Sequence, residues 1–443
     1  MDSDARPIVV VGGGAAGRAA AQELLASDAG RPILHLTGPA TEAIDRTMVD
    51  KAIMTGRLSP DRAMAMRPPL DGATTREDCV LAVAEAPGGW SVRLPGEEIV
   101  AAAVVVATGS QPYRLEVPGA DAWAAAGRLS TLHSVADALR IRELVEGVDG
   151  ARVLVTGAGL VGAEAASLMT AAGHRVTLVA RSALPGAAAW GPEIAQRLAR
   201  IHDAAVETHW ATRIVSLDEG IAVLDDGTAV EADLVIAAHG ARPRIPEGVP
   251  ALADGASAPG GVPVDDRLRV RGAAAPMVAA GAIAQHGGGA AGAGDRAGDR
   301  VGERDRVDER GGSYRIDHWD DAEAQGTHAA RTLLHALDRA EDPGPFRPRS
   351  PWSARVHGHQ LAGFGHPVPG TVERVVEADP LLVEFRAPGG PEEPPRPAGT
   401  AHPEGGARAA EASGDPNPSA VSAVVGLDAG RTLRDHARAT LLR

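Results

Sequence analysis

The sequence predicts an α/β fold with two Rossmann-like dinucleotide-binding units and a small α+β unit at the C-terminal end. Two glycine-rich stretches indicate this fold, because each follows a run of β-branched residues and precedes a run rich in alanine. The first runs from Ile8 to Val11 and on through Gly12 to Gly17. The second runs from Val153 to Thr156 and on through Gly157 to Gly162. Each therefore has the order strand, glycine turn, helix.

The glycine spacing in both stretches is typical of a loop that binds a pyrophosphate. The first glycine allows a tight turn, the second lets the backbone approach the ligand, and the third lets helix and strand pack closely. The N–H groups at the start of each helix then bind the phosphates. The residues assigned in this way are Gly12, Gly14, Ala15 and Gly17 in the first stretch and Gly157, Gly159, Leu160, Val161 and Gly162 in the second.

Length and composition limit the classes of protein. At 443 residues the chain is long enough for about three domains. Only 2% of the residues are aromatic, so the cores must be built from alanine, valine and leucine. A net charge of −14 argues against nucleic acid as a partner. No apolar run is long enough to span a membrane, and Ile8 follows no basic leader, so we expect a soluble, cytoplasmic protein.

Two residues are the only ones of their kind. Cys79 is the only cysteine, which excludes a redox pair of thiols, and we expect it to be a small buried residue. Lys51 is the only lysine among 44 cationic residues. A lysine ammonium is a compact charge whose pKa can move, unlike the guanidinium of arginine, so we expect a functional reason for Lys51. We expect no metal site.

The pattern of strands and helices divides the chain into three domains. Residues 1–118 and 246–340 form the first dinucleotide-binding domain, 119–245 the second, and 341–443 the C-terminal domain. We expect strands at 33–36, 80–83, 91–94, 104–106, 175–179, 233–237, 381–385 and 421–427, strands within 352–364, and helices at 317–337 and 432–442. Residues 287–312 and 387–419 have low complexity and few apolar side chains, so we expect mobile loops there.

An ordered set of short motifs resembles the ferredoxin-reductase branch of the FAD-dependent pyridine-nucleotide oxidoreductases, which includes the rhodocoxin and putidaredoxin reductases. The resemblance extends from Ile8 to about Leu442, apart from the two low-complexity stretches. The motifs are Gly12–Gly17, Asp45-Arg46 with Lys51, Ala107-Thr108-Gly109 with Pro118-Gly119, Gly157–Gly162 with Glu164, Gly240-Ala241-Arg242-Pro243, His318-Trp319-Asp320-Asp321-Ala322 and Trp352-Ser353.

The resemblance implies an FAD domain interrupted by an NAD(P)H domain and followed by an interface domain. Hydride would pass from NAD(P)H to FAD, and electrons would leave one at a time to a ferredoxin-type iron–sulfur protein. It implies that Lys51 and Glu164 form a catalytic ion pair beside the flavin. Further cofactor contacts would come from Arg46, Ala107, Thr108, Gly109, Gly240, Gly281, Ala282, His318, Trp319 and Trp352. The resemblance says nothing of the oligomeric state.

The sequence departs from this family pattern at three places. The acidic residue expected after the second strand is absent, since that region reads Thr37-Gly38-Pro39 and Glu42 comes late. The family's Gly-Asp pair, whose aspartate binds the ribityl chain, reads Gly281-Ala282. Arg181 follows the second strand of the NAD(P)H domain, where an acidic residue would select NADH, so we expect a preference for NADPH.

Two other functions stay open from the sequence. An NAD(P)H oxidase or diaphorase would pass electrons to oxygen or quinones instead of ferredoxin. A degenerate, non-catalytic nucleotide-binding protein would agree with the two absent carboxylates. Lys51, Glu164, Trp319 and both glycine-rich stretches favour the enzyme.

Overall fold

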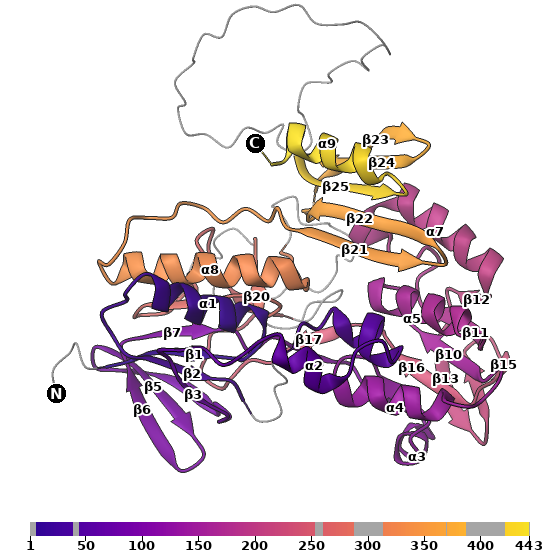
Figure 1. Cartoon of the computed structure of the whole chain (residues 1–443), viewed down its shortest axis with the longest axis horizontal. Helices are drawn as coiled ribbons and strands as arrows, with labels where there is room; N and C mark the ends of the chain where they lie inside the picture. The colour runs from indigo at the N-terminus through magenta and orange to yellow at the C-terminus, as the bar shows by residue number, and fades with distance from the viewer. Residues whose placement is uncertain are drawn as a thin grey trace, which may run out of the picture.

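The computed structural model describes residues 6–38, 44–252, 260–287, 313–368, 370–386 and 421–442. Three five-stranded sheets organise these residues, and helices cover them (Figure 1). Of the two low-complexity stretches, residues 288–312 and 387–419 lie outside the described residues.

The first sheet is parallel and has the order β19-β7-β1-β2-β3. Its central strand β1 (Ile8–Val11) lies between β2 (Ile33–Leu36) and β7 (Ala103–Val106), and all four of its residues are buried. An uninterrupted apolar strand of this kind is typical of a parallel sheet covered on both faces. The outer strands are β3 (Thr74–Arg76) and β19 (Met277–Ala279).

Two helices cover one face of the first sheet, and a small antiparallel sheet packs on its other side (Figure 1). The helices α1 (Ala15–Ala26) and α8 (Trp319–Ala336) approach so closely that a Cβ atom at Gly326 would lie 2.1 Å from the carbonyl oxygen of Ala16. The small sheet consists of β4 (Ala82–Ala86), β5 (Gly89–Leu94) and β6 (Glu97–Ala101).

The second parallel sheet has the order β12-β11-β10-β16-β9. Its strands are β9 (Leu129–Thr131), β10 (Arg152–Thr156), β11 (Arg175–Ala180), β12 (Glu207–Trp210) and β16 (Leu234–Ala237). Its helices are α3 (Ala120–Ala125), α4 (Val135–Val145), α5 (Leu160–Ala171), α6 (Ala187–Trp190) and α7 (Pro192–Ala205). A small antiparallel sheet adds β13 (Ile214–Asp218), β14 (Ile221–Leu224) and β15 (Ala229–Glu231).

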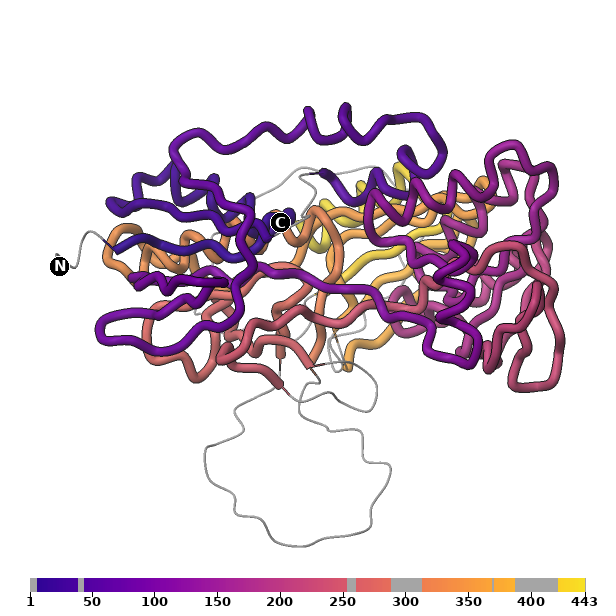
Figure 2. Tube along the Cα trace, turned by 90° about the horizontal axis from the view of Figure 1, so that it is seen from below, coloured from indigo at the N-terminus to yellow at the C-terminus, as the bar shows by residue number. Residues whose placement is uncertain are grey.

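The two stretches that connect these sheets run side by side (Figure 2). On the way out the chain forms β8 (Ser110–Pro112), and on the way back it forms the antiparallel partner β17 (Ala241–Pro243). The short strands β18 (Val262–Pro263) and β20 (Ala284–Gln285) follow the return.

One segment of the N-terminal part packs away from the first sheet. The π-helix η2 (Val49–Met54) is followed by α2 (Pro60–Ala65). Val49 and Ile53 are buried in the same hydrophobic cluster as Ile141 of α4 and Ile236 of β16. This segment, which carries Lys51, therefore rests on the core of the second sheet.

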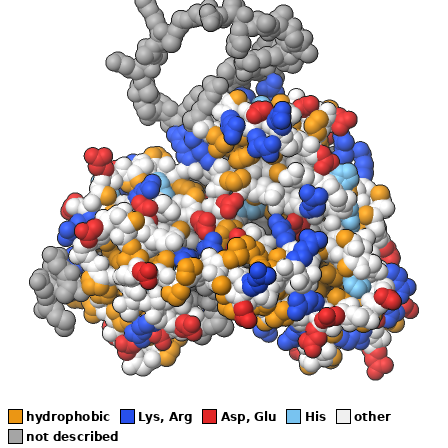
Figure 3. Space-filling model, viewed as in Figure 1, with side chains coloured by type: hydrophobic (Ala, Val, Ile, Leu, Met, Phe, Trp, Pro, Cys, Tyr) orange, Lys and Arg blue, Asp and Glu red, His pale blue; other side chains and the backbone are white. Residues whose placement is uncertain are grey.

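The C-terminal sheet is antiparallel and has the order β21-β22-β25-β24-β23. Its strands are β21 (Pro351–Val356), β22 (His359–Gly365), β23 (Val372–Ala378), β24 (Leu381–Arg386) and β25 (Val421–Leu427), and α9 (Gly430–Thr440) packs on it. Leu361 and Val383 share a core with Ile194 and Leu198 of α7. On the face shown in Figure 3, acidic and basic side chains are interspersed.

The strands and helices predicted from the sequence are present, with ends shifted by up to three residues. The strand expected at 80–83 spans Ala82–Ala86, and the final helix begins at Gly430, two residues early. The prediction for Cys79 was wrong, because its side chain is only partly buried beside β4. No helix in the described ranges is long and apolar enough to cross a membrane.

The contact between α1 and α8 gives a first testable prediction. Gly326→Ala places a methyl group 2.1 Å from the Ala16 carbonyl oxygen, so the helices must separate. We expect a loss of about 1–3 kcal/mol in the free energy of unfolding, measured by denaturant titration. Gly430→Ala is the matched control, because a Cβ atom there meets nothing within 4 Å. Equal stability of the two variants would contradict the close packing.

Candidate functional site

The first glycine-rich loop is tight at its ends and open at its middle. A Cβ atom at Gly12 would lie 2.1 Å from the carbonyl oxygen of Ala107, and one at Gly17 would lie 1.9 Å from that of Gly12. Gly12 also has a φ of +121°, which other residues rarely adopt. A Cβ atom at Gly14 would meet nothing within 4 Å.

The second loop repeats this arrangement. A Cβ atom at Gly157 would lie 2.3 Å from the Ala238 carbonyl oxygen, and one at Gly162 would lie 1.8 Å from that of Gly157. Around Gly159 the space is again open within 4 Å. Both helices begin at the open glycine, and neither has a side chain that caps its first N–H groups. The residues present therefore fit a pyrophosphate at the start of each helix. The first helical residues, whose backbone N–H groups are available there, are Ala15 in α1 and Leu160 and Val161 in α5.

A buried histidine fixes the first loop, and the sequence analysis missed it. The Nε2 atom of His35, on β2, lies 2.9 Å from the carbonyl oxygen of Gly12. Burial lowers the pKa of His35, so its neutral ring holds the turn. An isolated histidine in an apolar strand, as in Ile-Leu-His-Leu, is the signal that could have found it.

Lys51 of η2 and Glu164 of α5 meet beside the C-terminal sheet. The Nζ atom of Lys51 lies 3.4 Å from Oε2 of Glu164 and donates a hydrogen bond of 3.2 Å to the carbonyl oxygen of Ser353. The other carboxylate oxygen of Glu164 accepts a hydrogen bond of 2.9 Å from the backbone N–H of Arg355. One ion pair therefore joins η2, α5 and β21.

The carboxyl group of Glu164 is electrostatically unusual. Burial, and after it the nearby negative charge of Asp50, raise the pKa of Glu164 to about 7, although the Arg355 N–H and Lys51 act in the opposite direction. Asp50 is itself buried, and burial raises its pKa as well. The sequence analysis did not single out Asp50, although it directly precedes Lys51.

The three aromatic residues predicted at the site lie near each other but in different surroundings. His318 stacks on Trp352 with ring centres 5.5 Å apart, and Trp352 donates a hydrogen bond to the carbonyl oxygen of Gly365. Trp319 begins α8 and lies under the guanidinium of Arg67 at 4.5 Å. Burial lowers the pKa of His318, so this ring is neutral at physiological pH.

The turn at Gly281 and Ala282 is held by hydrogen bonds from within the protein. The N–H of Gly281 donates to Oε1 of Gln325, and the Gln325 amide donates to Asp321. The carbonyl oxygen of Ala282 accepts a hydrogen bond of 2.7 Å from Arg315. The carboxyl group of Asp321 is buried and is connected to this turn only through the side chain of Gln325.

The remaining predicted residues lie at the crossing between the two parallel sheets or at the edge of the second. Thr108 and Gly109 both bond to the backbone of Arg244, and Gly240 accepts a hydrogen bond from the N–H of Tyr113. Arg46 donates to the carbonyl oxygen of His133. Arg181 is exposed and directly follows β11. Burial of His239 lowers the pKa of its imidazole, and the positive charge of Arg181 acts in the same direction.

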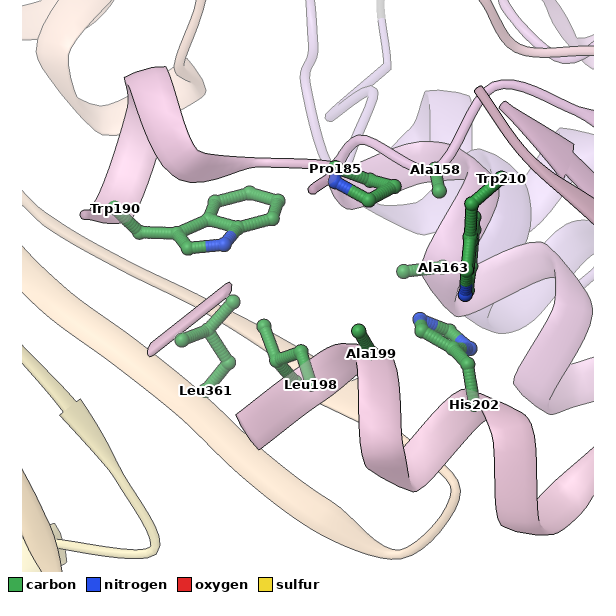
Figure 4. A pocket seen from close by; sticks show the side chains of 9 residues that line it. All are labelled: Ala158, Ala163, Pro185, Trp190, Leu198, Ala199, His202, Trp210 and Leu361. Carbon is green, nitrogen blue, oxygen red and sulfur yellow. The ribbon is translucent and has the colours of Figure 1, made fainter. Parts of the chain in front are cut away.

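A small enclosed cavity lies beside the second loop, and its volume of about 10 Å³ suits a single water molecule (Figure 4). Figure 4 shows the indole of Trp190 and the imidazole of His202 facing this space, with Leu361 closing it from β22. The indole N–H of Trp190 has no hydrogen-bond partner among the described residues. The cavity is too small for a dinucleotide and is not the cofactor site.

Comparison with known proteins agrees with this geometry. Residues 6–326 match the family described as pyridine nucleotide-disulphide oxidoreductase. The nitric oxide reductase FlRd-NAD(+) reductase of Aeromonas hydrophila is 30% identical over 276 residues, covering 60% of this chain and 67% of that protein. The rubredoxin-NAD(+) reductase of Alcanivorax borkumensis is 26% identical, covering 54% and 63% respectively.

The same fold recurs in a solved complex of putidaredoxin reductase with putidaredoxin. The likeness has a TM-score of 0.70 at 18% identity and covers 98% of this chain and 92% of that one. The chain belongs to the pyridine nucleotide-disulphide oxidoreductase family, and it is an FAD-dependent NAD(P)H oxidoreductase similar to the ferredoxin reductases. Cys79 is the only cysteine in the sequence, so the sequence has no pair of thiols that could form an intramolecular redox disulphide.

The two open glycines give a prediction that separates binding from folding. Gly14→Ala and Gly159→Ala add a methyl group where the protein leaves space, so we expect no change in Tm of the protein without cofactor. Each methyl group keeps a pyrophosphate from the helix start, and loss of one charge-assisted hydrogen bond weakens affinity about tenfold to a hundredfold. Gly14→Ala should weaken FAD and Gly159→Ala should weaken NAD(P)H, measured by fluorescence titration. If either variant weakened both ligands equally, the assignment of the loops would be wrong.

Proposed function

We propose that this chain carries electrons from NADPH, in preference to NADH, through FAD to a small ferredoxin-type iron–sulfur protein. The contact between Lys51 and Glu164 carries the proposal, because it places the only lysine of the sequence beside a buried carboxylate where η2, α5 and β21 meet. The names of two relatives support an iron-protein partner, since one is a rubredoxin reductase and another a flavorubredoxin-linked reductase.

The proposal assigns a part of the chain to each ligand. Residues 1–118 and 246–340 hold FAD, 119–245 hold NADPH, and 341–443 form the interface with the protein partner. The FAD contacts are Gly12, Gly14, Ala15, Gly17, Arg46, Lys51, Ala107, Thr108, Gly109, Gly281, Ala282, His318, Trp319 and Trp352. The NADPH contacts are Gly157, Gly159, Leu160, Val161, Gly162, Arg181 and Gly240. The proposal also includes a cytoplasmic location.

Bound FAD supplies the step from two-electron to one-electron transfer, which side chains alone cannot perform. The chain contributes position and charge. Lys51 places its ammonium group beside Glu164, where it stabilises negative charge that develops in the site. Glu164 is fixed by the Arg355 N–H and in turn fixes the direction of the Lys51 side chain.

The visible spectrum of the purified full-length protein, incubated with FAD and desalted, tests the proposal. We expect flavin bands that bleach with NADPH in the absence of oxygen, and that recover when oxidised ferredoxin is added. A colourless protein would overturn the proposal. Recovery with oxygen or a quinone but not with any ferredoxin or rubredoxin would favour the oxidase or diaphorase function instead.

Arg181 gives a separate prediction about the nicotinamide cofactor. Arg181→Ala removes a cation suited to the 2′-phosphate, so the KM for NADPH should rise about tenfold to a hundredfold while that for NADH stays constant. Arg175→Ala is the matched control, because Arg175 is exposed at the opposite end of β11. A higher kcat/KM for NADH than for NADPH in the wild-type protein would contradict the preference. The names of the two relatives contain NAD(+), which indicates NADH as the cofactor of those proteins.

A further inference from the structure

Asp50 places a second buried carboxyl group beside the Lys51–Glu164 pair. Its side chain is 7% exposed, and its Oδ1 atom accepts a hydrogen bond of 2.8 Å from the N–H of Lys51. It lies in η2, a π-helix, and such widened turns are often found at functional sites. The family resemblance gave no role to this residue.

The charges around Lys51 do not balance if both neighbouring carboxyl groups are ionised. Glu164 is 6% exposed, so two buried carboxyl groups face one ammonium group. Asp50 and Glu164 also interact directly with each other. Two carboxyl groups can form a hydrogen bond only when one of them carries a proton, since an ionised carboxylate is solely an acceptor. One proton shared between them removes the excess negative charge.

Among the residues that the structure describes, the other elements packed against this group bring no second cation into an ion pair with Asp50 or Glu164. From β21 it receives only main-chain atoms, the Ser353 carbonyl oxygen and the Arg355 N–H. From α4, Arg142 donates to the carbonyl oxygen of Ile53, at the other end of η2. Asp320, in the first turn of α8, adds negative charge near Lys51. These surroundings favour retention of a proton.

We propose that Asp50 and Glu164 form a proton-holding pair, beside the ammonium group of Lys51, that alternates between one shared proton and none. This role rests on the proposed function. Oxidation of one NADPH by two one-electron acceptors yields NADP⁺, two reduced acceptors and one proton. The pair takes up that proton and later releases it to water, which can reach the pair because the neighbouring Lys51 side chain is 40% exposed. Asp50 is a positioning residue, because it acts through Glu164.

A pH titration of the full-length protein by infrared spectroscopy tests the shared proton without requiring activity. We expect a protonated-carboxyl C=O band that disappears around pH 7, the value to which the pKa of Glu164 is raised. In Asp50→Asn this step should shift to lower pH by about one unit, because the neighbouring negative charge is gone. In Glu164→Gln it should be absent. Asp321→Asn, a buried carboxyl with a pKa raised to about 6, should remove an earlier step only.

The pH profile of electron transfer to the acceptor tests the role. Only the deprotonated pair can accept a proton, so the rate should rise as the pH increases through about 7. Asp50→Asn should move this rise to lower pH by a similar amount, with unchanged Tm, whereas the exposed Asp61→Asn should leave it in place. An infrared titration without the step near pH 7, or with the same midpoint in Asp50→Asn, would overturn the shared proton. If the infrared step near pH 7 were observed but the protein bound no flavin, the shared proton would be supported and its role in electron transfer would be overturned.

Discussion

The contacts of Glu164 link α5 of the second parallel sheet to η2 and to the C-terminal sheet. Glu164 lies in the second turn of α5, five residues after the open glycine of the second loop, so one helix carries both the loop's end and the carboxylate. One of its oxygens binds the backbone of β21 and the other binds Lys51 of η2. Three residues further along α5, Ser167 accepts a hydrogen bond of 2.8 Å from the N–H of His357. Glu164 and Ser167 of α5 therefore fix the position of β21, and with it the C-terminal sheet, relative to the second parallel sheet.

Small side chains make these close contacts possible. With almost no aromatic residues in the cores, the chain packs helix on strand and helix on helix through glycine and alanine, at Gly17, Gly162 and Gly326. Dense packing of this kind transmits displacement, because no loose side chain absorbs it. Of the few aromatic residues, Trp352 stacks on His318 and Trp190 lies beside the second loop, whereas Trp90 and Trp123 are buried in the cores of the sheets.

The sequence predicted the parts of the fold that depend on local pattern. The strand–glycine–helix order identified both loops, and the geometry at Gly14 and Gly159 agrees with the role assigned to the middle glycine. The meeting of Lys51 with Glu164 came from the resemblance, since 113 positions separate them and no local pattern links them. Asp50 and His35 could not be found in this way, because their roles depend on burial by segments distant in sequence. The packing of η2 on the second core has the same cause.

The two absent carboxylates concern how FAD is held. At Gly281 and Ala282 the protein satisfies its own turn through Gln325 and Arg315, and Asp321 is bonded inward to Gln325. No buried acid among these residues points back to replace the missing one. Each lost charge-assisted hydrogen bond weakens binding by about 1.5–3 kcal/mol. The affinity for FAD must then come chiefly from backbone N–H groups at Gly14 and from apolar contact. Such contacts do not depend on an acidic side chain, so they are insensitive to pH. Glu164 and Asp50 can therefore gain or lose a proton without releasing the cofactor.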